Sequence, residues 1–465
     1  MKRTHNKTLL AAACAAALTG AAAPAGAADW LMLQGTEPAG QAPRIKVWGF
    51  IQAQYQKDYS DPNPSDGSYI PPKLIGPNLT TQSQFGVNRA RLGARGTGFP
   101  LDPNVNYFLL AEFGNNAITN ANEGSIYITD ASVTLNHLKK FTRVRMGLFK
   151  TPGPEEGLQA IHVFDYINFT SVGNQLMLER FPNYRYTPNF SGTGDDTLTG
   201  DLNQFERPVG AFRDTGIQFF NNFKLQNNWE WSYAFMVGNG NGLNFGDRDD
   251  NKDTYGYLSV AKVFGGKGPW REDWKFFAWT QNGKRTIDSF VDDDADGIDD
   301  GYSPEEHDRK RWGVGTKYLK KPFRFTAEYM DGEGMIFVGP DKPTFDQNGS
   351  KPEANGLDGK ASGWYVEGGW YIPNTNWEID ARYDVYNRLE DDPGPPGGPN
   401  AGRSFESVWK TWTLGVQYHF NKKTRATLNY QIRNVESPDW PAGAGPNANM
   451  DGIKNRLALQ LTHIF

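Results

Sequence analysis

The sequence predicts an all-β protein: a transmembrane antiparallel up-and-down β-barrel of about sixteen strands, with long external loops and short periplasmic turns. Three observations predict this class. The chain begins like a secreted protein, apolar and polar residues alternate over repeated strand-length stretches, and the connections between those stretches are long and short in turn. Together they indicate a wall that separates lipid from water.

Residues 1–27 are expected to be a signal peptide. They combine basic residues in the first seven positions, an apolar stretch over residues 9–18 and small residues up to a cleavage point near Ala27. The apolar stretch is shorter than the roughly 20 residues that a membrane-spanning helix needs. The single cysteine, Cys14, lies inside this segment, so the processed chain would lack disulfide and thiol chemistry.

The composition fits a barrel between lipid and water. Aromatic residues make up 14% of the chain and glycine supplies 52 residues, although the mean hydropathy of -0.63 resembles that of a soluble protein. The formal net charge of -5 makes nucleic acid an unfavourable partner.

Alternation of residue types is the main indication of strands. In residues 425–433, four apolar side chains alternate with polar ones, and in residues 376–386 the alternation places four charged side chains on one face. A helix could not place those charges together. The candidate strands cover residues 44–57, 84–97, 104–114, 126–137, 141–150, 213–224, 228–238, 254–264, 273–283, 309–319, 322–331, 363–372, 376–386, 409–420, 424–434 and 455–465.

The connections between these strands alternate long and short. Since the first is long, we expect both ends of the barrel domain, residues 44–465, on the periplasmic side. The third external connection, about residues 151–212, is the longest. A terminal Phe465 with apolar residues spaced two apart resembles the assembly signal of outer-membrane barrels. A soluble β-sandwich or propeller would explain the alternation but not this rhythm.

Several stretches resemble one family. RVRMGLFKTP at residues 143–152, followed by Glu155 and Glu156, resembles a strand and turn of the phosphate-selective porin O and P family. NRARLGARG at 88–96, VGNGNG at 237–242 and ARYD at 381–384 are also similar. The resemblance implies a sixteen-stranded barrel, usually a homotrimer, with an external loop folded into the pore. Residues 151–212 are the natural constriction loop.

The resemblance and the alternation together suggest a water-filled channel for passive diffusion of small hydrophilic solutes. Basic residues gather on the strands that lead into the constriction loop, and guanidinium groups match the oxygens of phosphate or carboxylate. We therefore hypothesise a preference for anions such as phosphate. The residues expected to line the pore and select anions are Arg89, Arg91, Arg95, Arg143, Arg145, Lys150, Arg180 and Arg185.

An alternative is a charge-balanced general porin. In that case the arginines would pair with Glu112, Asp130 and the acidic constriction residues Glu155 and Glu156. A second alternative is a sleeve that holds a multihaem cytochrome and conducts electrons. The conductance of the isolated protein would distinguish these alternatives, because an empty sleeve is wide.

The fifth external loop contains an acidic motif. Aspartates at positions 1, 3 and 5 followed by glycine reproduce the first half of a calcium-binding loop, although Ser303 occupies the twelfth position. The alternative is a solvated acidic loop without bound metal. The residues expected to hold calcium are Asp292, Asp294, Asp296 and Asp300.

No pattern points to an enzyme. The six histidines are scattered, and nucleophile elbows, phosphate-binding glycine loops and metal-binding spacings are missing from the sequence. Apart from calcium, no cofactor is expected. The expected partners are outer-membrane lipid, lipopolysaccharide and other copies of the chain. Residues 28–43 form a periplasmic lead-in, either flexible or exchanged with a neighbouring copy.

Overall fold

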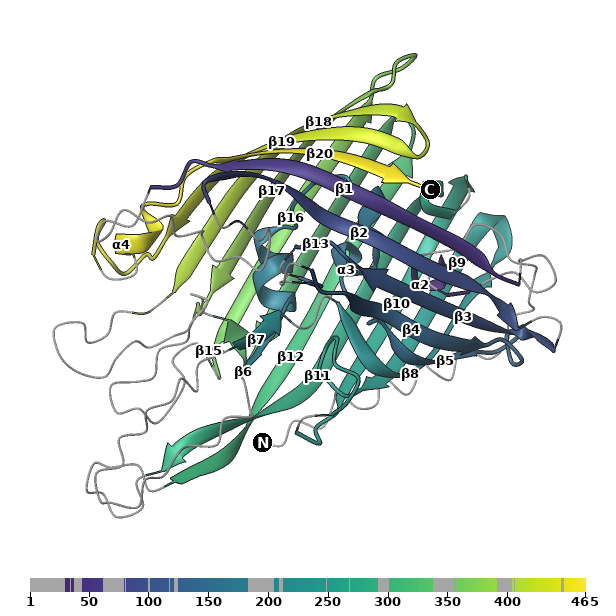
Figure 1. Cartoon of the computed structure of the whole chain (residues 1–465), viewed down its shortest axis with the longest axis horizontal. Coiled ribbons are helices and arrows are strands. Elements are labelled where there is room, and N and C mark those ends of the chain that lie inside the picture. Colours follow the sequence, from purple (N-terminus) through teal and green to yellow (C-terminus); the bar gives the residue numbers. More distant parts are fainter. Residues whose placement is uncertain are drawn as a thin grey trace.

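The computed structural model shows a closed barrel. It describes residues 30–33, 35–36, 44–61, 79, 81–98, 101–116, 118–120, 124–182, 205–208, 212–247, 249–266, 268–291, 301–337, 355–356, 358–390, 404, 406–444 and 447–465. Within these residues, sixteen strands form an antiparallel ring in which each strand pairs with the barrel strands before and after it, and the last closes on the first (Figure 1). The expected fold class is confirmed.

The observed strands lie close to the expected ones. The main difference is a longer pair, β11 and β12, which continues into the fifth external connection as a paired hairpin. The barrel strands are β1 (Lys46–Asp58), β2 (Ser83–Gly98), β3 (Asp102–Glu112), β4 (Tyr127–Leu135), β5 (Arg143–Lys150), β8 (Arg213–Lys224), β9 (Trp229–Gly238), β10 (Asp253–Gly265), β11 (Glu272–Val291), β12 (Gly301–Lys320), β13 (Phe323–Glu333), β16 (Lys360–Tyr371), β17 (Trp377–Arg388), β18 (Ser407–Asn421), β19 (Thr424–Glu436) and β20 (Arg456–Ile464).

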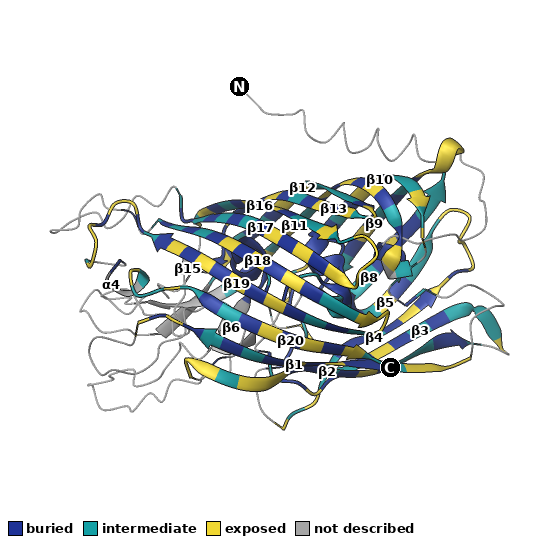
Figure 2. Cartoon of the chain, turned by 90° about the horizontal axis from the view of Figure 1, so that it is seen from above, coloured by how far each residue is buried: buried dark blue, intermediate teal, exposed yellow. Residues whose placement is uncertain are grey.

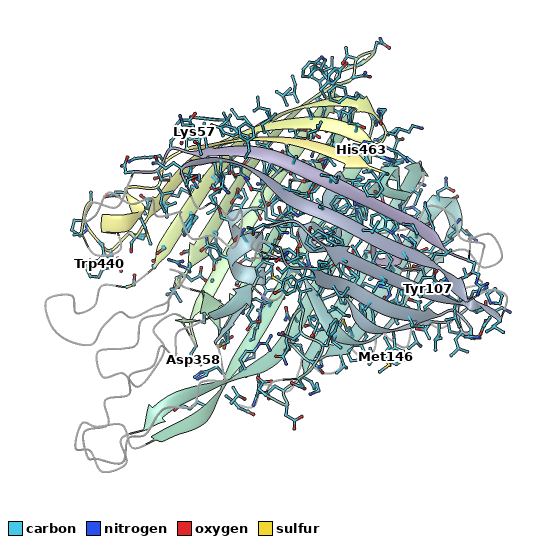
Figure 3. The ribbon with its side chains drawn as sticks, viewed as in Figure 1. Lys57, Tyr107, Met146, Asp358, Trp440 and His463 are labelled. Carbon is cyan, nitrogen blue, oxygen red and sulfur yellow. The ribbon has the colours of Figure 1, made fainter. Side chains whose placement is uncertain are left out.

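Burial alternates along the strands as the sequence predicts. In β19, Leu428, Tyr430 and Ile432 are exposed on the outer surface, whereas the residues between them are buried. The same pattern recurs around the ring as alternating dark and yellow bands (Figure 2). Met146 on β5 points away from the barrel (Figure 3) and is 66% exposed. Because the side-chain period of a strand is two, one apolar face meets lipid and one polar face meets the lumen.

Strand β5 depends on glycine at one position of the RVRMGLFKTP stretch. Gly147 has φ +122°, and a Cβ there would lie 2.2 Å from the carbonyl oxygen of Ala131 on β4. A side chain would therefore both strain the backbone and force β4 and β5 apart.

Short elements occupy the connections. In the part of the chain that the structure describes, no helix is long and apolar enough to cross a bilayer. The expected signal peptide, residues 1–27, lies outside the described residues. The elements are α2 (Trp30–Leu33), α3 (Glu155–Leu158), η2 (Ile161–Val163), η3 (Gly173–Met177), β6 (Arg180–Pro182), β7 (Phe205–Pro208), η4 (Gln226–Asn228), η5 (Gly268–Trp270), β14 (Ile336–Phe337), β15 (Asn355–Gly356) and α4 (Asn447–Met450).

A charge on the outer face should destabilise the barrel. Replacing Leu428, which is 42% exposed near the middle of β19, by lysine should lower the free energy of unfolding by about 2–4 kcal/mol, because an ammonium group is costly in hydrocarbon. The measurement is urea unfolding in lipid vesicles, followed by tryptophan fluorescence. Leu428→Met is the control and should change little; an equal loss in both variants would contradict a lipid-facing position.

Candidate functional site

The third external loop folds into the barrel and crosses its lumen. From the end of β5 it reaches strands on the far side of the ring, so α3 lies within the circle of strands (Figure 1). The backbone N–H of Glu155 donates to the Glu328 carboxylate on β13 at 3.1 Å, and that of Ile167 donates to the Asn429 side chain on β19 at 2.8 Å. The expected constriction by this loop is confirmed.

Two adjacent loop carboxylates bind basic residues of the far wall, by which we mean strands β11, β12, β13, β16 and β17. Glu155 contacts the ammonium groups of Lys275 at 2.6 Å and Lys317 at 3.1 Å, and Glu156 contacts the guanidinium of Arg382 at 3.4 Å. All of these side chains are buried or half-buried. Charge-balanced pairing of Glu155 and Glu156 therefore involves the far wall, and not the arginines of β2 and β5.

Two further loop carboxylates extend the same attachment. Asp165 lies 3.2 Å from the Arg324 guanidinium, while Glu179 is bound by Arg285 at 2.8 Å and by Arg309 at 2.5 Å. Burial alone would raise the pKa of Glu179, but the two arginines hold that pKa below its ordinary value. Ion pairs therefore hold the loop to the wall both near its start, at Glu155, and at Glu179.

Other wall arginines bind carbonyl groups of the loop backbone. Arg311 donates to the carbonyl oxygen of Leu176 at 3.0 Å, and Arg382 donates to that of Asn168 at 2.9 Å. A loop inside a barrel has few backbone partners of its own, and an unpaired buried carbonyl is costly. These arginines consequently stabilise the loop and are less available to passing solutes.

Apolar packing adds to these polar contacts. Buried loop residues and inward-facing aromatic residues of the wall belong to one hydrophobic cluster inside the barrel. Burial of these side chains favours the folded-in position of the loop through removal of apolar surface from water. The cluster includes Leu158, Val163, Val172, Leu176, Met177, Leu178, Tyr257, Phe277, Trp279, Tyr365 and Tyr386.

The opposite side of the lumen carries a group of basic residues that we call the basic wall. It comes from β2, β5 and the start of β8, which are close neighbours in the ring. Its carboxylates, Glu112 and Asp130, compensate only part of its charge. The basic wall consists of Arg89, Arg91, Arg95, Arg143, Arg145, Lys150 and Arg213.

Arg91 and Arg213 of the basic wall form ion pairs. Arg91 lies 2.7 Å from Glu112, and Arg213 lies 3.0 Å from Asp130, all four side chains being buried. The expected pairing with Glu112 therefore involves Arg91, whereas Asp130 pairs with Arg213, which the sequence did not place among the anion-selecting residues.

Three other members contact neutral groups. Arg89 donates to the Gln52 amide oxygen at 3.2 Å, Arg143 donates to the Asn136 amide oxygen at 2.8 Å, and Lys150 donates to the Gln159 carbonyl at 2.7 Å. Among the described residues, none of the three contacts a carboxylate. Their hydrogen bonds therefore go to the dipoles of amide and carbonyl groups.

A loop histidine lies close to this positive region. The His162 ring packs 5.7 Å from Trp48 and 4.9 Å from Phe50, measured between ring centroids. Burial, together with the positive charges of Arg425 and Lys150, lowers the pKa of His162 to about 3. The ring is therefore neutral near pH 7 and adds no charge to the constriction.

Some expected residues lie outside the described part of the chain. Arg180 begins β6, but its side chain is not among those described, and Arg185 is also outside. Their roles in selectivity stay predictions. The same holds for the acidic calcium motif, whose residues Asp292, Asp294, Asp296 and Asp300 are not described.

The sequence reasoning missed several residues that hold the loop. Lys275 and Arg285 share the inward face of β11, and Arg309 shares the inward face of β12 with Arg311. Alternation, if continued along the full length of these strands, would have placed all of them in the lumen. Glu179 carried no such signal, because it lies in an irregular part of the loop.

A comparison with protein-family models matches residues 287–439 to the family described as phosphate-selective porin O and P. Over these residues, the resemblance to the porin O and P family is confirmed. The match extends from the end of β11 through β19, and it includes the ARYD stretch at residues 381–384 but not the other similar stretches.

Comparison with solved structures supports the fold. OmpF from Salmonella typhi, solved with daunomycin, is 12% identical, with 90% of this chain and 97% of that chain covered and a TM-score of 0.50. An anion-selective porin from Comamonas acidovorans is 13% identical, with 91% and 100% covered and a TM-score of 0.48. At this identity the likeness to OmpF shows the fold alone. A search of curated proteins found no match.

The porin O and P match and the barrel fold point to an outer-membrane channel rather than to an enzyme. The matched segment contains the strands that carry Lys317, Arg324 and Arg382, which bind the loop carboxylates. The basic wall lies on strands before the matched segment.

Loss of the Glu179 charge should loosen the loop. Glu179→Gln should lower the free energy of unfolding by about 1–3 kcal/mol and increase the current noise of the open channel, because two buried arginines lose a charged partner. The control is Glu306→Gln, which removes the same charge from a half-exposed pair with Lys284. Thermal unfolding and single-channel recording measure both effects; identical behaviour of the two variants would show that the Glu179 ion pairs contribute nothing.

Calcium binding to the acidic motif is tested by titration. If the aspartates converge on one cation, isothermal titration should detect Ca²⁺ binding near or below millimolar concentration. The double variant Asp292→Asn with Asp294→Asn should abolish the heat. Absence of binding by the unaltered protein at that concentration would leave the loop as a solvated acidic segment.

Proposed function

We propose that this protein is an outer-membrane porin for small hydrophilic solutes that favours anions such as phosphate. One observation carries the preference for anions: Arg89, Arg143 and Lys150 face the lumen and have only neutral hydrogen-bond partners. Fixed charges on a narrow pore raise the local concentration of ions of opposite sign. Guanidinium groups also suit the geometry of oxyanions.

Lumen cations without carboxylate partners support this proposal over a charge-balanced pore. On the far wall, basic residues bind the loop carboxylates Glu155, Glu156 and Glu179. On the basic wall, Arg91 and Arg213 pair with carboxylates, whereas Arg89, Arg143 and Lys150 bind amides and carbonyls. Positive charge without a carboxylate partner therefore remains at Arg89, Arg143 and Lys150.

The inward loop favours a channel over a cytochrome sleeve. A sleeve needs a wide lumen, whereas here loop residues contact β1, β13 and β19 across the interior. A modest conductance of the isolated protein supports the porin, and a very large conductance would support the sleeve. From the family resemblance we also infer a homotrimer in contact with lipid and lipopolysaccharide.

Ion selectivity tests the function. In a planar bilayer with a salt gradient, the reversal potential should show that chloride passes more readily than potassium, and added phosphate should reduce the chloride current. Replacing Arg89 and Arg143 together by glutamine should lower the permeability ratio of chloride to potassium by about twofold or more, because two uncompensated charges are lost.

The control removes the same charge elsewhere. Lys57 lies on the outward face of β1, and Lys410 is about 40% exposed beside Glu436. Their replacement by glutamine should leave the permeability ratio unchanged. Preference of the unaltered protein for potassium, or an equal effect of both double variants, would refute the proposal.

A further inference from the structure

The N-terminal lead-in enters the barrel. Its described residues, 30–33 and 35–36, which we call the strap, begin with the short helix α2. Trp30, Leu31 and Met32 are only 8%, 2% and 7% exposed, and they belong to the hydrophobic cluster that includes the constriction loop. The sequence left this segment either flexible or exchanged with a neighbour; the described part is buried within its own chain.

One end of the strap is attached to β2 and β3. The Arg95 guanidinium on β2 donates to the carbonyl oxygens of Leu33 at 3.1 Å and Thr36 at 3.2 Å. Gly35, with φ +61°, lies so close to β3 that a Cβ there would be 3.0 Å from the Cβ of Phe108. Two hydrogen bonds and one close approach thus fix this end.

The other end reaches the opposite side of the ring. The Lys317 ammonium on β12 lies 5.5 Å from the centroid of the Trp30 ring, and α2 contacts η5, which joins β10 to β11. In the ring, β2 and β12 are separated by seven intervening strands along one arc. The strap therefore runs across the lumen and not along its wall.

The position of the strap is on the periplasmic side of the constriction loop. Arg95 and Lys317 lie near the ends of β2 and β12 that join short turns. Lys317 also binds Glu155 of α3 at 3.1 Å, so loop and strap share one basic residue. A solute that passes the loop meets the strap next.

We propose that the strap is a second constriction that sets the size limit of the solutes admitted by the pore. The inference rests on the proposed channel function and adds a size filter to it. Trp30, Leu31 and Met32 pack against the loop inside the barrel and so fill part of the cross-section of the lumen. A smaller open cross-section excludes larger hydrated solutes, because those must shed water to pass.

Deletion of residues 30–36 tests the strap. In a planar bilayer, single-channel conductance should rise by about twofold, and neutral polyethylene glycols larger than those that enter the unaltered pore should become permeant. Ion selectivity should remain, because the basic wall is untouched apart from the carbonyl partners of Arg95. If the deletion leaves conductance, size limit and selectivity unchanged, the proposed role of the strap is wrong, while the channel function stands. If the protein without any substitution shows no channel activity, the proposed function itself is wrong.

A point variant covers the case in which the deletion prevents folding. Gly35→Ala should raise conductance and the size limit in the same direction, because a Cβ would push Gly35 away from Phe108. Gly443→Ala is the matched control: this glycine has φ +71°, and a Cβ there would meet nothing within 4 Å. Equal conductance of both variants and the unaltered protein would refute the inference; a rise in the Gly35 variant alone would support it.

Discussion

The whole molecule depends on the lack of hydrogen-bond partners in hydrocarbon. Backbone N–H and C=O groups that cross a bilayer must bond to one another, and for strands this requires a ring without edges. The pairing of β20 with β1 closes that ring. In a closed ring, successive side chains of each strand point alternately to the lipid and to the lumen, since the side-chain period of a strand is two. The inward-facing residues then line the lumen. The chemistry of the lumen depends on which polar residues occupy these positions.

The same requirement governs the interior. A long loop that enters the barrel brings backbone groups and carboxylates that lose most of their water. Here the far wall replaces the water: Lys275 and Arg382 bind loop carboxylates, and Arg311 binds a loop carbonyl. Arginine suits both tasks because its planar group has five donors. Basic residues in a porin lumen therefore cannot all be counted as selectivity residues, since some hold the structure that narrows the pore.

The alternation of apolar and polar residues was sufficient to predict the fold, because it depends only on the residues within each strand. The alternation in β17 and β19 identified strands, faces and approximate ends. Contacts inside the lumen were less accessible, because they depend on which strands face one another after closure. The Glu155 pairs with Lys275 and Lys317 join residues far apart in the chain, and no periodicity encodes them. The strap was missed for a related reason: its few apolar residues, Trp30 to Leu33, are too short for any period.

The rigidity of the loop and the proposed selectivity of the pore depend on how the lumen cations are paired. If every lumen cation were paired with loop carboxylates, the loop would be firmly held but the passage would have little net charge. If none were paired, the loop would lose its attachment and buried carboxylates would stand uncompensated. Both roles are present: Arg285 and Arg309 bind the Glu179 carboxylate, whereas Arg89 and Arg143 bind only amides. Rigidity and residual positive charge therefore arise from the same residue type in different surroundings.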